Sequence, residues 1–272
     1  MKKFEGMLFC TDLDGTLYTD DKTVSKENLD AISYFKEEGG LFTFITGRVP
    51  QTAKAVYNLI QPNAPYGCGN GVGIYDPVAE KYLWAQYLPQ DAIELVQTVD
   101  RERPEIGIQF NVEKRIYFNK DNSAMERFRA LTGVPNIYCH YEDVKEPVLK
   151  VVFAHRDEGQ IDQLAELLNN HPLASAVEFI RSEHSLYEML PKAVSKGDVL
   201  LRLAQFLKID PAKTIAVGDY YNDVSMVRLA GKGFAVANAV EDVKAVADYI
   251  TVSNNEHAIA AIVDGLEKGT WK

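Results

Sequence analysis

The chain has 272 residues, of which 46% are apolar and 25% charged, and its formal net charge is −10. This length allows a large core, or a core domain with a smaller second domain, while the negative charge argues against a nucleic-acid binder or a membrane-surface protein. Three cysteines without a CxxC pair argue against disulfides and zinc sites. Because the sequence also shows neither a membrane span nor a signal peptide, we expect a cytoplasmic protein without nucleic-acid or membrane partners.

The first expected strand is a short apolar run over residues 7–10 that leads directly to Asp12 and Asp14. Such a run, ending at turn residues, is typical of a buried strand in a parallel sheet. Open α/β sheets bind ligands at the carboxyl ends of these strands. There Asp12 could attack phosphorus, and Asp14 could act as general acid and base. Taken alone, this stretch also fits an Asp-Gly hairpin turn.

Two carboxylates this close repel each other, so either a cation lies between them or one of them keeps its proton. A hard cation with oxygen ligands, Mg²⁺ above all, suits the pair Asp12 and Asp14. Gly15 permits a sharp turn that would direct backbone N–H groups toward a phosphate.

A second buried strand is expected over residues 41–45, after a helix over residues 25–38. It ends in a short polar loop formed by Thr46, Gly47 and Arg48. A hydroxyl and a glycine at a strand end, beside a helix N-terminus, provide a site for phosphate oxygens. An ordinary strand-to-helix loop is the alternative. Further on, Asn70-Gly71 predicts a hairpin.

From about residue 84 the pattern changes to short helices and strands, and none of these strands ends in a carboxylate pair. We interpret residues 84–189 as an inserted α+β cap domain. The flanking segments, 1–83 and 190–272, would form an α/β core domain with a parallel sheet.

The first pattern resumes with Ser195, the expected N-cap of a helix over residues 196–208. Lys196 lies in the first turn, where the helix dipole disfavours a cation. It is therefore either a solvated surface lysine or a charge directed at phosphate and Asp12. The next buried strand, 214–217, delivers three polar side chains that could complete a cation site: Asp219, Asn222 and Asp223. N-capping of the following helix by one of the last two is the alternative.

In this order, the motifs resemble those of the haloacid dehalogenase (HAD) superfamily, and in particular its Cof-type phosphatases of subclass IIB. The four matching motifs are Asp12-Leu13-Asp14-Gly15-Thr16, Thr46-Gly47-Arg48, Lys196-Gly197 and a GDxxNDxxM segment from Gly218 to Met226. Asn70-Gly71 is similar to the NGA hairpin of this family, with Val72 in place of alanine. The sequence departs from the family at Glu256-His257-Ala258, where Glu-Asp-Gly is common.

The resemblance implies a Rossmann-like core with an inserted cap. It implies that Asp12 is the nucleophile and a metal ligand, and that Asp14 is the general acid and base, with its backbone carbonyl on Mg²⁺. The residues implied to bind phosphate or substrate are Thr46, Gly47, Arg48, Lys196 and Asn222. The residues implied to bind the metal are Asp12, Asp14, Asp219 and Asp223.

The expected function is Mg²⁺-dependent hydrolysis of small phosphorylated metabolites through an aspartyl-phosphate intermediate. Sugar phosphates, pyridoxal phosphate and flavin-related phosphates are typical substrates of the resembled family. A phosphosugar mutase on the same scaffold and a non-catalytic phospho-acceptor switch are the alternatives. The cap would close over the site and contact the leaving group, for which Arg115, Tyr117 and Lys150 are candidates. We expect a monomer or a weak homodimer.

Overall fold

The computed structural model describes residues 2–271, which divide into two compact units. The first, here called the core unit, comprises residues up to Gly47, Ala53–Trp84 and the chain from Ser195 onward. The second, here called the cap unit, comprises Ala85–Val194 together with the short segment Arg48–Thr52. Among the described residues, no helix is long and apolar enough to cross a membrane.

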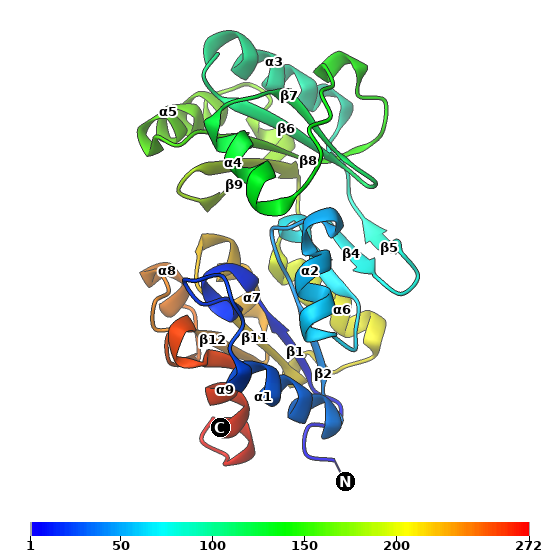
Figure 1. Ribbon diagram of the computed structural model, residues 1–272, viewed down its shortest axis with the longest axis vertical. Coiled ribbons are helices and arrows are strands. Elements are labelled where there is room, and N and C mark those ends of the chain that lie inside the picture. Colours follow the sequence, from blue (N-terminus) through cyan, green and yellow to red (C-terminus); the bar gives the residue numbers. More distant parts are fainter. Residues whose placement is uncertain (1, 272) are drawn as a thin grey trace. The chain divides into compact units, whose positions relative to one another are not determined.

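The core unit contains a parallel five-stranded sheet in the order β13-β12-β11-β1-β2 (Figure 1). Its strands are β1 (Leu8–Thr11), β2 (Leu41–Phe44), β11 (Thr214–Gly218), β12 (Lys232–Ala235) and β13 (Tyr249–Ile250). Thr11, the last residue of β1, lies opposite Phe44 of β2 and Val217 of β11. The carboxyl ends of these three strands therefore meet at one edge, and the predicted α/β class with a parallel sheet is confirmed.

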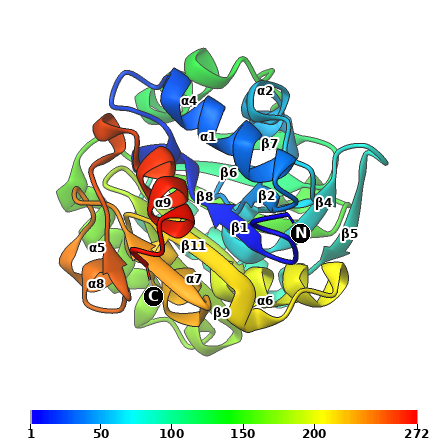
Figure 2. The ribbon, with the colours of Figure 1, turned by 90° about the horizontal axis from the view of Figure 1, so that it is seen from below.

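Helices cover both faces of this sheet, because successive strand residues point to opposite sides. Phe9 packs in a cluster that includes side chains of α1 (Lys26–Glu37), α2 (Pro50–Ile60) and α9 (Ala258–Glu267). Its neighbours Leu8 and Cys10 pack in another cluster, with α6 (Lys196–Leu207). Figure 2 shows β1 and β11 between α1 and α9 on one side and α6 on the other. The remaining core helices are α7 (Val224–Leu229) and α8 (Glu241–Lys244).

A small three-stranded sheet joins the core unit beside the end of β2. Its strands are β3 (Tyr66–Cys68), β4 (Gly73–Asp76) and β5 (Lys81–Ala85), and β3 and β4 are antiparallel. The turn between β3 and β4 contains Asn70-Gly71, so the predicted hairpin is confirmed. A parallel bridge between Ile45 and Gly67 attaches this hairpin to the end of β2.

The cap unit is built on an antiparallel five-stranded sheet in the order β7-β6-β8-β10-β9. The strands are β6 (Gly107–Val112), β7 (Ile116–Lys120), β8 (Val148–Ala154), β9 (Val177–Glu183) and β10 (Leu186–Pro191). One face packs against α3 (Ile93–Glu102) and α5 (Glu158–Asn169), while α4 (Ser123–Thr132) packs against Ile116 and Phe118 on the other. This is the α+β arrangement expected for the insertion.

The expected helices over residues 25–38 and 196–208 correspond to α1 and α6. The expected strands over residues 41–45 and 214–217 correspond to β2 and β11, and all four elements agree with the prediction to within one residue at either end.

Candidate active site

Asp12 lies immediately after β1, and its backbone N–H donates to the carbonyl of Val217 at 3.0 Å. The chain then makes a tight turn over Leu13–Leu17, in which Gly15 has a φ of +81°. A Cβ at Gly15 would lie 2.4 Å from Asp219 Oδ2. Glycine is thus required here both by the backbone conformation and by the close approach of the Asp219 carboxylate.

The loop after β11 is held together by the carboxylate of Asp223. The N–H groups of Asp219 and Tyr220 donate to Asp223 Oδ2 at 2.9 and 3.2 Å. Thr16, from the first motif, donates through Oγ1 to Asp219 Oδ1 at 2.7 Å. Asp223 makes no side-chain cap to α7 itself, but its carboxylate caps the short 3-10 turn over Tyr221–Asp223 that leads into α7, by accepting from the N–H of Tyr220. The capping alternative therefore holds for this turn, beside the contact with Lys196 described next.

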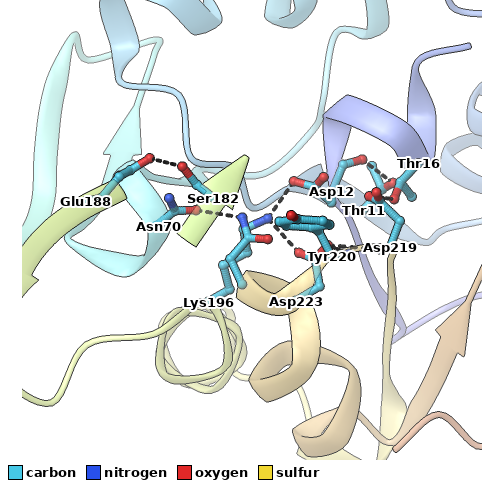
Figure 3. Close-up of polar contacts among 11 residues, drawn as sticks. Thr11, Asp12, Thr16, Asn70, Ser182, Glu188, Lys196, Asp219, Tyr220 and Asp223 are labelled. Carbon is cyan, nitrogen blue, oxygen red and sulfur yellow. Dashed lines mark hydrogen bonds and ion pairs between the residues drawn. The ribbon is translucent and has the colours of Figure 1, made fainter. Parts of the chain in front are cut away.

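Lys196 brings the two carboxylate loops together. Ser195 caps α6 as predicted, since its Oγ accepts from the N–H of Asp198 at 3.1 Å. The Lys196 side chain is completely buried, and its Nζ donates to Asp12 Oδ1 and to Asp223 Oδ1, both at 2.6 Å (Figure 3). The surface-lysine alternative is therefore wrong.

This site holds more carboxyl groups than positively charged groups. Burial raises the pKa of Asp12 well above its ordinary value, and the nearby Asp223 carboxylate adds to this effect. Burial, followed by the charge of Asp223, raises the pKa of Asp219 to about 7. Burial by itself would lower the pKa of Lys196, but the Asp12 and Asp223 carboxylates hold it above its ordinary value. One buried ammonium thus faces three crowded carboxyl groups.

A divalent cation fits this arrangement. One carboxylate oxygen from each of Asp12, Asp219 and Asp223 lies within 4.8 Å of the others. Carboxylate oxygens are the ligands that hard cations such as Mg²⁺ prefer, and a cation would compensate the excess negative charge. The Asp14 carboxylate is not in this group; it is partly exposed and pairs with Lys22 Nζ at 3.1 Å.

Thr46 and Gly47 lie at the end of β2, and the β3–β4 turn contacts them. Thr46 donates its N–H to the carbonyl of Gly67 at 3.1 Å and accepts from the N–H of Asn70 at 3.0 Å. Asn222 Nδ2 donates to Asn70 Oδ1 at 3.0 Å. The structure therefore gathers Thr46, Gly47 and Asn222 around Asn70. Arg48 belongs to the segment assigned to the cap unit.

Thr16 and Asn70 were not among the sequence-predicted site residues, although both lie within recognised motifs. Asn238 also reaches this region, donating through Nδ2 to the carbonyl of Gly15 at 2.8 Å. The signal for Thr16 and Asn70 was their place in a motif, but the motif alone does not show what either side chain contacts.

The three cap candidates lie in different surroundings. Lys150 is buried and pairs with Glu188. Tyr117 packs in the cluster beneath α3 and α5, and its hydroxyl donates to Glu146 at 2.8 Å. Arg115 is more exposed and lies 3.7 Å from the same glutamate. Their contact with a leaving group stays a prediction.

Comparisons with known proteins identify related sequences along almost the whole chain. The family model described as haloacid dehalogenase-like hydrolase matches residues 9–263. The 5-amino-6-(5-phospho-D-ribitylamino)uracil phosphatase YitU of Bacillus subtilis is 26% identical, over 93% of this chain and 94% of that protein. The pyridoxal phosphate phosphatase YbhA of Escherichia coli is also 26% identical, over 93% and 95%.

Solved structures show the same fold. A haloacid dehalogenase-like hydrolase from Bacteroides thetaiotaomicron superimposes with a TM-score of 0.84 at 25% identity, over 95% of this chain and 98% of that one. The HAD subclass IIB sugar phosphatase BT4131 gives a TM-score of 0.83 at 22% identity, over 96% and 99%.

Proposed function

We propose, on the premise that this chain belongs to the haloacid dehalogenase-like hydrolase family, that it hydrolyses small phosphorylated metabolites with a divalent cation and through an aspartyl-phosphate intermediate. Its enzyme class is that of its phosphatase relatives, phosphoric monoester hydrolase. The observation that carries the mechanism is the buried Lys196 between Asp12 and Asp223, at the edge where three parallel strands end.

In the first step, an oxygen of the Asp12 carboxylate forms a bond to phosphorus while the ester P–O bond breaks. Asp14 gives a proton to the departing oxygen. In the second step, water attacks the phosphorus and the bond to Asp12 breaks, while Asp14 takes the proton from water. The partial exposure of the Asp14 side chain suits this role, because it permits proton exchange with solvent.

The rest of the catalysis would come from positioning of the reacting groups and from electrostatic stabilisation of the transition state, because phosphoryl transfer spreads negative charge over the equatorial oxygens. The ammonium of Lys196 would meet part of that charge while orienting Asp12. Mg²⁺ held by Asp12, Asp219 and Asp223, with the backbone carbonyl of Asp14, would supply further positive charge beside the phosphoryl oxygens. Thr16 restrains one oxygen of Asp219 and so helps to fix this ligand.

The substrate class follows from the relatives. The names of YitU and YbhA assign them 5-amino-6-(5-phospho-D-ribitylamino)uracil and pyridoxal phosphate, respectively, as substrates. We propose that the chain acts on a phosphorylated metabolite of similar size, bound through its phosphoryl group by Thr46, Gly47, Lys196 and Asn222. Arg48 completes the proposed set of phosphate-binding residues.

The test is phosphate release from a panel of sugar phosphates, pyridoxal phosphate and flavin-related phosphates in Mg²⁺. We expect turnover by the wild type and a loss of more than about 10⁴-fold for Asp12→Asn, because a carboxamide is a poor nucleophile. EDTA should abolish wild-type turnover and Mg²⁺ restore it. Isomerisation without free phosphate would favour a mutase instead, and retention of more than a few per cent of activity by Asp12→Asn would exclude the covalent mechanism.

A further inference from the structure

Asn70 occupies a backbone conformation that few residues adopt readily. It lies in the turn between β3 and β4 with φ +61° and ψ +29°, in the left-handed region that asparagine and glycine tolerate best. Its N–H donates to the carbonyl of Thr46 at 3.0 Å. Only 1% of the residue is exposed. The turn therefore fixes the amide side chain against the end of β2.

The Asn70 amide has unused hydrogen-bonding capacity. Its Oδ1 accepts from Asn222 Nδ2 at 3.0 Å, but its Nδ2 has no hydrogen-bond partner among the described residues. The Oδ1 of Asn222 is likewise buried and unpartnered within the described part of the chain. Leaving a buried polar group unpaired is costly. The amide pair thus presents one free donor and one free acceptor where a ligand could satisfy them.

The surroundings of this amide indicate which ligand it would meet. A Cβ built on Gly47 would lie 3.0 Å from both amide atoms of Asn70, so the absent side chain leaves the space in front of the amide open. The next residue of the turn, Gly71, packs directly on the start of α6, because a Cβ on Gly71 would lie 2.5 Å from the backbone of Ser195, the residue before Lys196. The Asn70 amide therefore adjoins Gly47 and Asn222, two residues to which the proposed function assigns phosphate binding, and its turn packs on the helix that carries Lys196.

We propose that Asn70 is a phosphate-binding residue whose Nδ2 donates to an oxygen of the phosphoryl group held at Asp12, while Asn222 orients the amide. The inference rests on the proposed function and adds a residue to it. The turn packs against α6 and the end of β2, so Asn70 would add its donor to those that Lys196 and Thr46 supply from the same two places.

The test is the affinity for orthophosphate, measured by isothermal titration calorimetry in the presence of Mg²⁺. Asn70→Gly suits the left-handed turn and removes the Nδ2 donor without adding charge. We expect roughly a tenfold to hundredfold weaker binding, because one hydrogen bond to a charged oxygen is lost. Asn70→Asp keeps the turn and the acceptor for Asn222, but it replaces the donor with an oxygen and adds a negative charge that repels phosphate, so it should weaken binding at least as much. Weaker binding by Asn70→Asp beside unchanged binding by Asn70→Gly would assign the loss to the added charge and overturn the inference.

Asn28 offers a matched control, because it is a buried asparagine of α1 whose Nδ2 is also unpartnered among the described residues. Its Oδ1 accepts from the N–H of Ala260 at 3.1 Å. Asn28→Asp makes the same chemical change outside the proposed site, and we expect it to leave the orthophosphate affinity unchanged. An equal loss in Asn28→Asp and Asn70→Asp would assign the effect to folding and overturn the inference.

The remaining outcomes separate this inference from the proposed function. Wild type that binds orthophosphate and hydrolyses esters, beside an Asn70→Asp variant of unchanged affinity, would overturn the role of Asn70 alone. Wild type that neither binds orthophosphate nor releases it from any ester would overturn both.

Discussion

The core and cap units each bury a lysine paired with carboxylates, and the two clusters differ in their balance of charge. In the core, Lys196 contacts Asp12 and Asp223, with the Asp219 carboxylate close by. In the cap, Lys150 on β8 pairs with Glu188 on the neighbouring strand β10. Ser182 donates to the other oxygen of Glu188, as Figure 3 also shows.

This difference separates two uses of a buried charge. The Lys150–Glu188 pair is neutral, and such a pair roughly offsets its own desolvation cost without requiring any ligand. The core cluster gathers three carboxyl groups around one ammonium and raises the pKa of Asp12 and Asp219. A fold gains no stability from such crowding. The imbalance is instead what a site for a cation and a reacting phosphoryl group requires.

Among the tests of this comparison between the two lysine clusters, the largest expected effect is the loss of activity in Lys196→Met. Removing this ammonium would take away the charge proposed to face the phosphoryl oxygens, so kcat/KM should fall by roughly 10³-fold or more. Steady-state phosphate release measures this loss, and Lys26→Met, which removes an exposed cation of α1, is the control. Near-normal turnover by Lys196→Met would contradict the distinction between the core and cap clusters, because the core cluster with its excess of carboxyl groups would then have no catalytic role.

The second effect is on stability and belongs to the cap. Lys150→Met leaves the buried Glu188 without its cation, which should lower the free energy of unfolding by about 3–5 kcal/mol. Hydrogen exchange followed by mass spectrometry should place the loss in peptides from β8 and β10. The double variant Lys150→Met/Glu188→Leu should recover most of the stability. If the single variant were as stable as the wild type, the view of this pair as a structural unit would be wrong.

A smaller effect is the stabilisation by Mg²⁺. At a concentration about 100-fold above its Kd, the ion should raise the free energy of unfolding by about 2.7 kcal/mol, with a corresponding rise in Tm in thermal denaturation. Asp219→Asn should lose most of this increase, because it removes one of the three grouped carboxylates. Lys150→Met should keep it. If Mg²⁺ stabilised Asp219→Asn and Lys150→Met equally, the proposed difference between the core and cap clusters would be wrong.

The positions of the site residues along the fold could be predicted from the sequence. Apolar runs ending at Asp12, Thr46 and Asp219 indicate parallel strands, whose carboxyl ends meet at one edge. The sequence does not show which side chains meet there. Lys196 bridges Asp12, 184 positions away, and Asp223, 27 positions away, and such long-range contacts depend on how the helices pack.

In the cap unit, too, the sequence predicts local structure but not the long-range contacts of the side chains. Alternation predicts that Tyr117 and its neighbour Phe118 point to opposite faces of the sheet. It does not show that α3 and α5 cover the face of Tyr117 while α4 covers that of Phe118. Likewise, the Asn70-Gly71 motif predicts a turn, but the partner of its amide comes from a segment 152 positions away.

The strand order of the core has a consequence for how the chain assembles during synthesis. β1 lies between β2 and β11, and Asp12 is anchored to Val217. The cap sheet, in contrast, comes from the continuous segment 107–191. On the ribosome, the cap can therefore fold from local contacts while β1 still has an open edge, and long-range parallel pairing is the slow step. Asp12, the proposed nucleophile, is synthesised well before Lys196, Asp219 and Asp223, so its site is completed only after those later segments emerge.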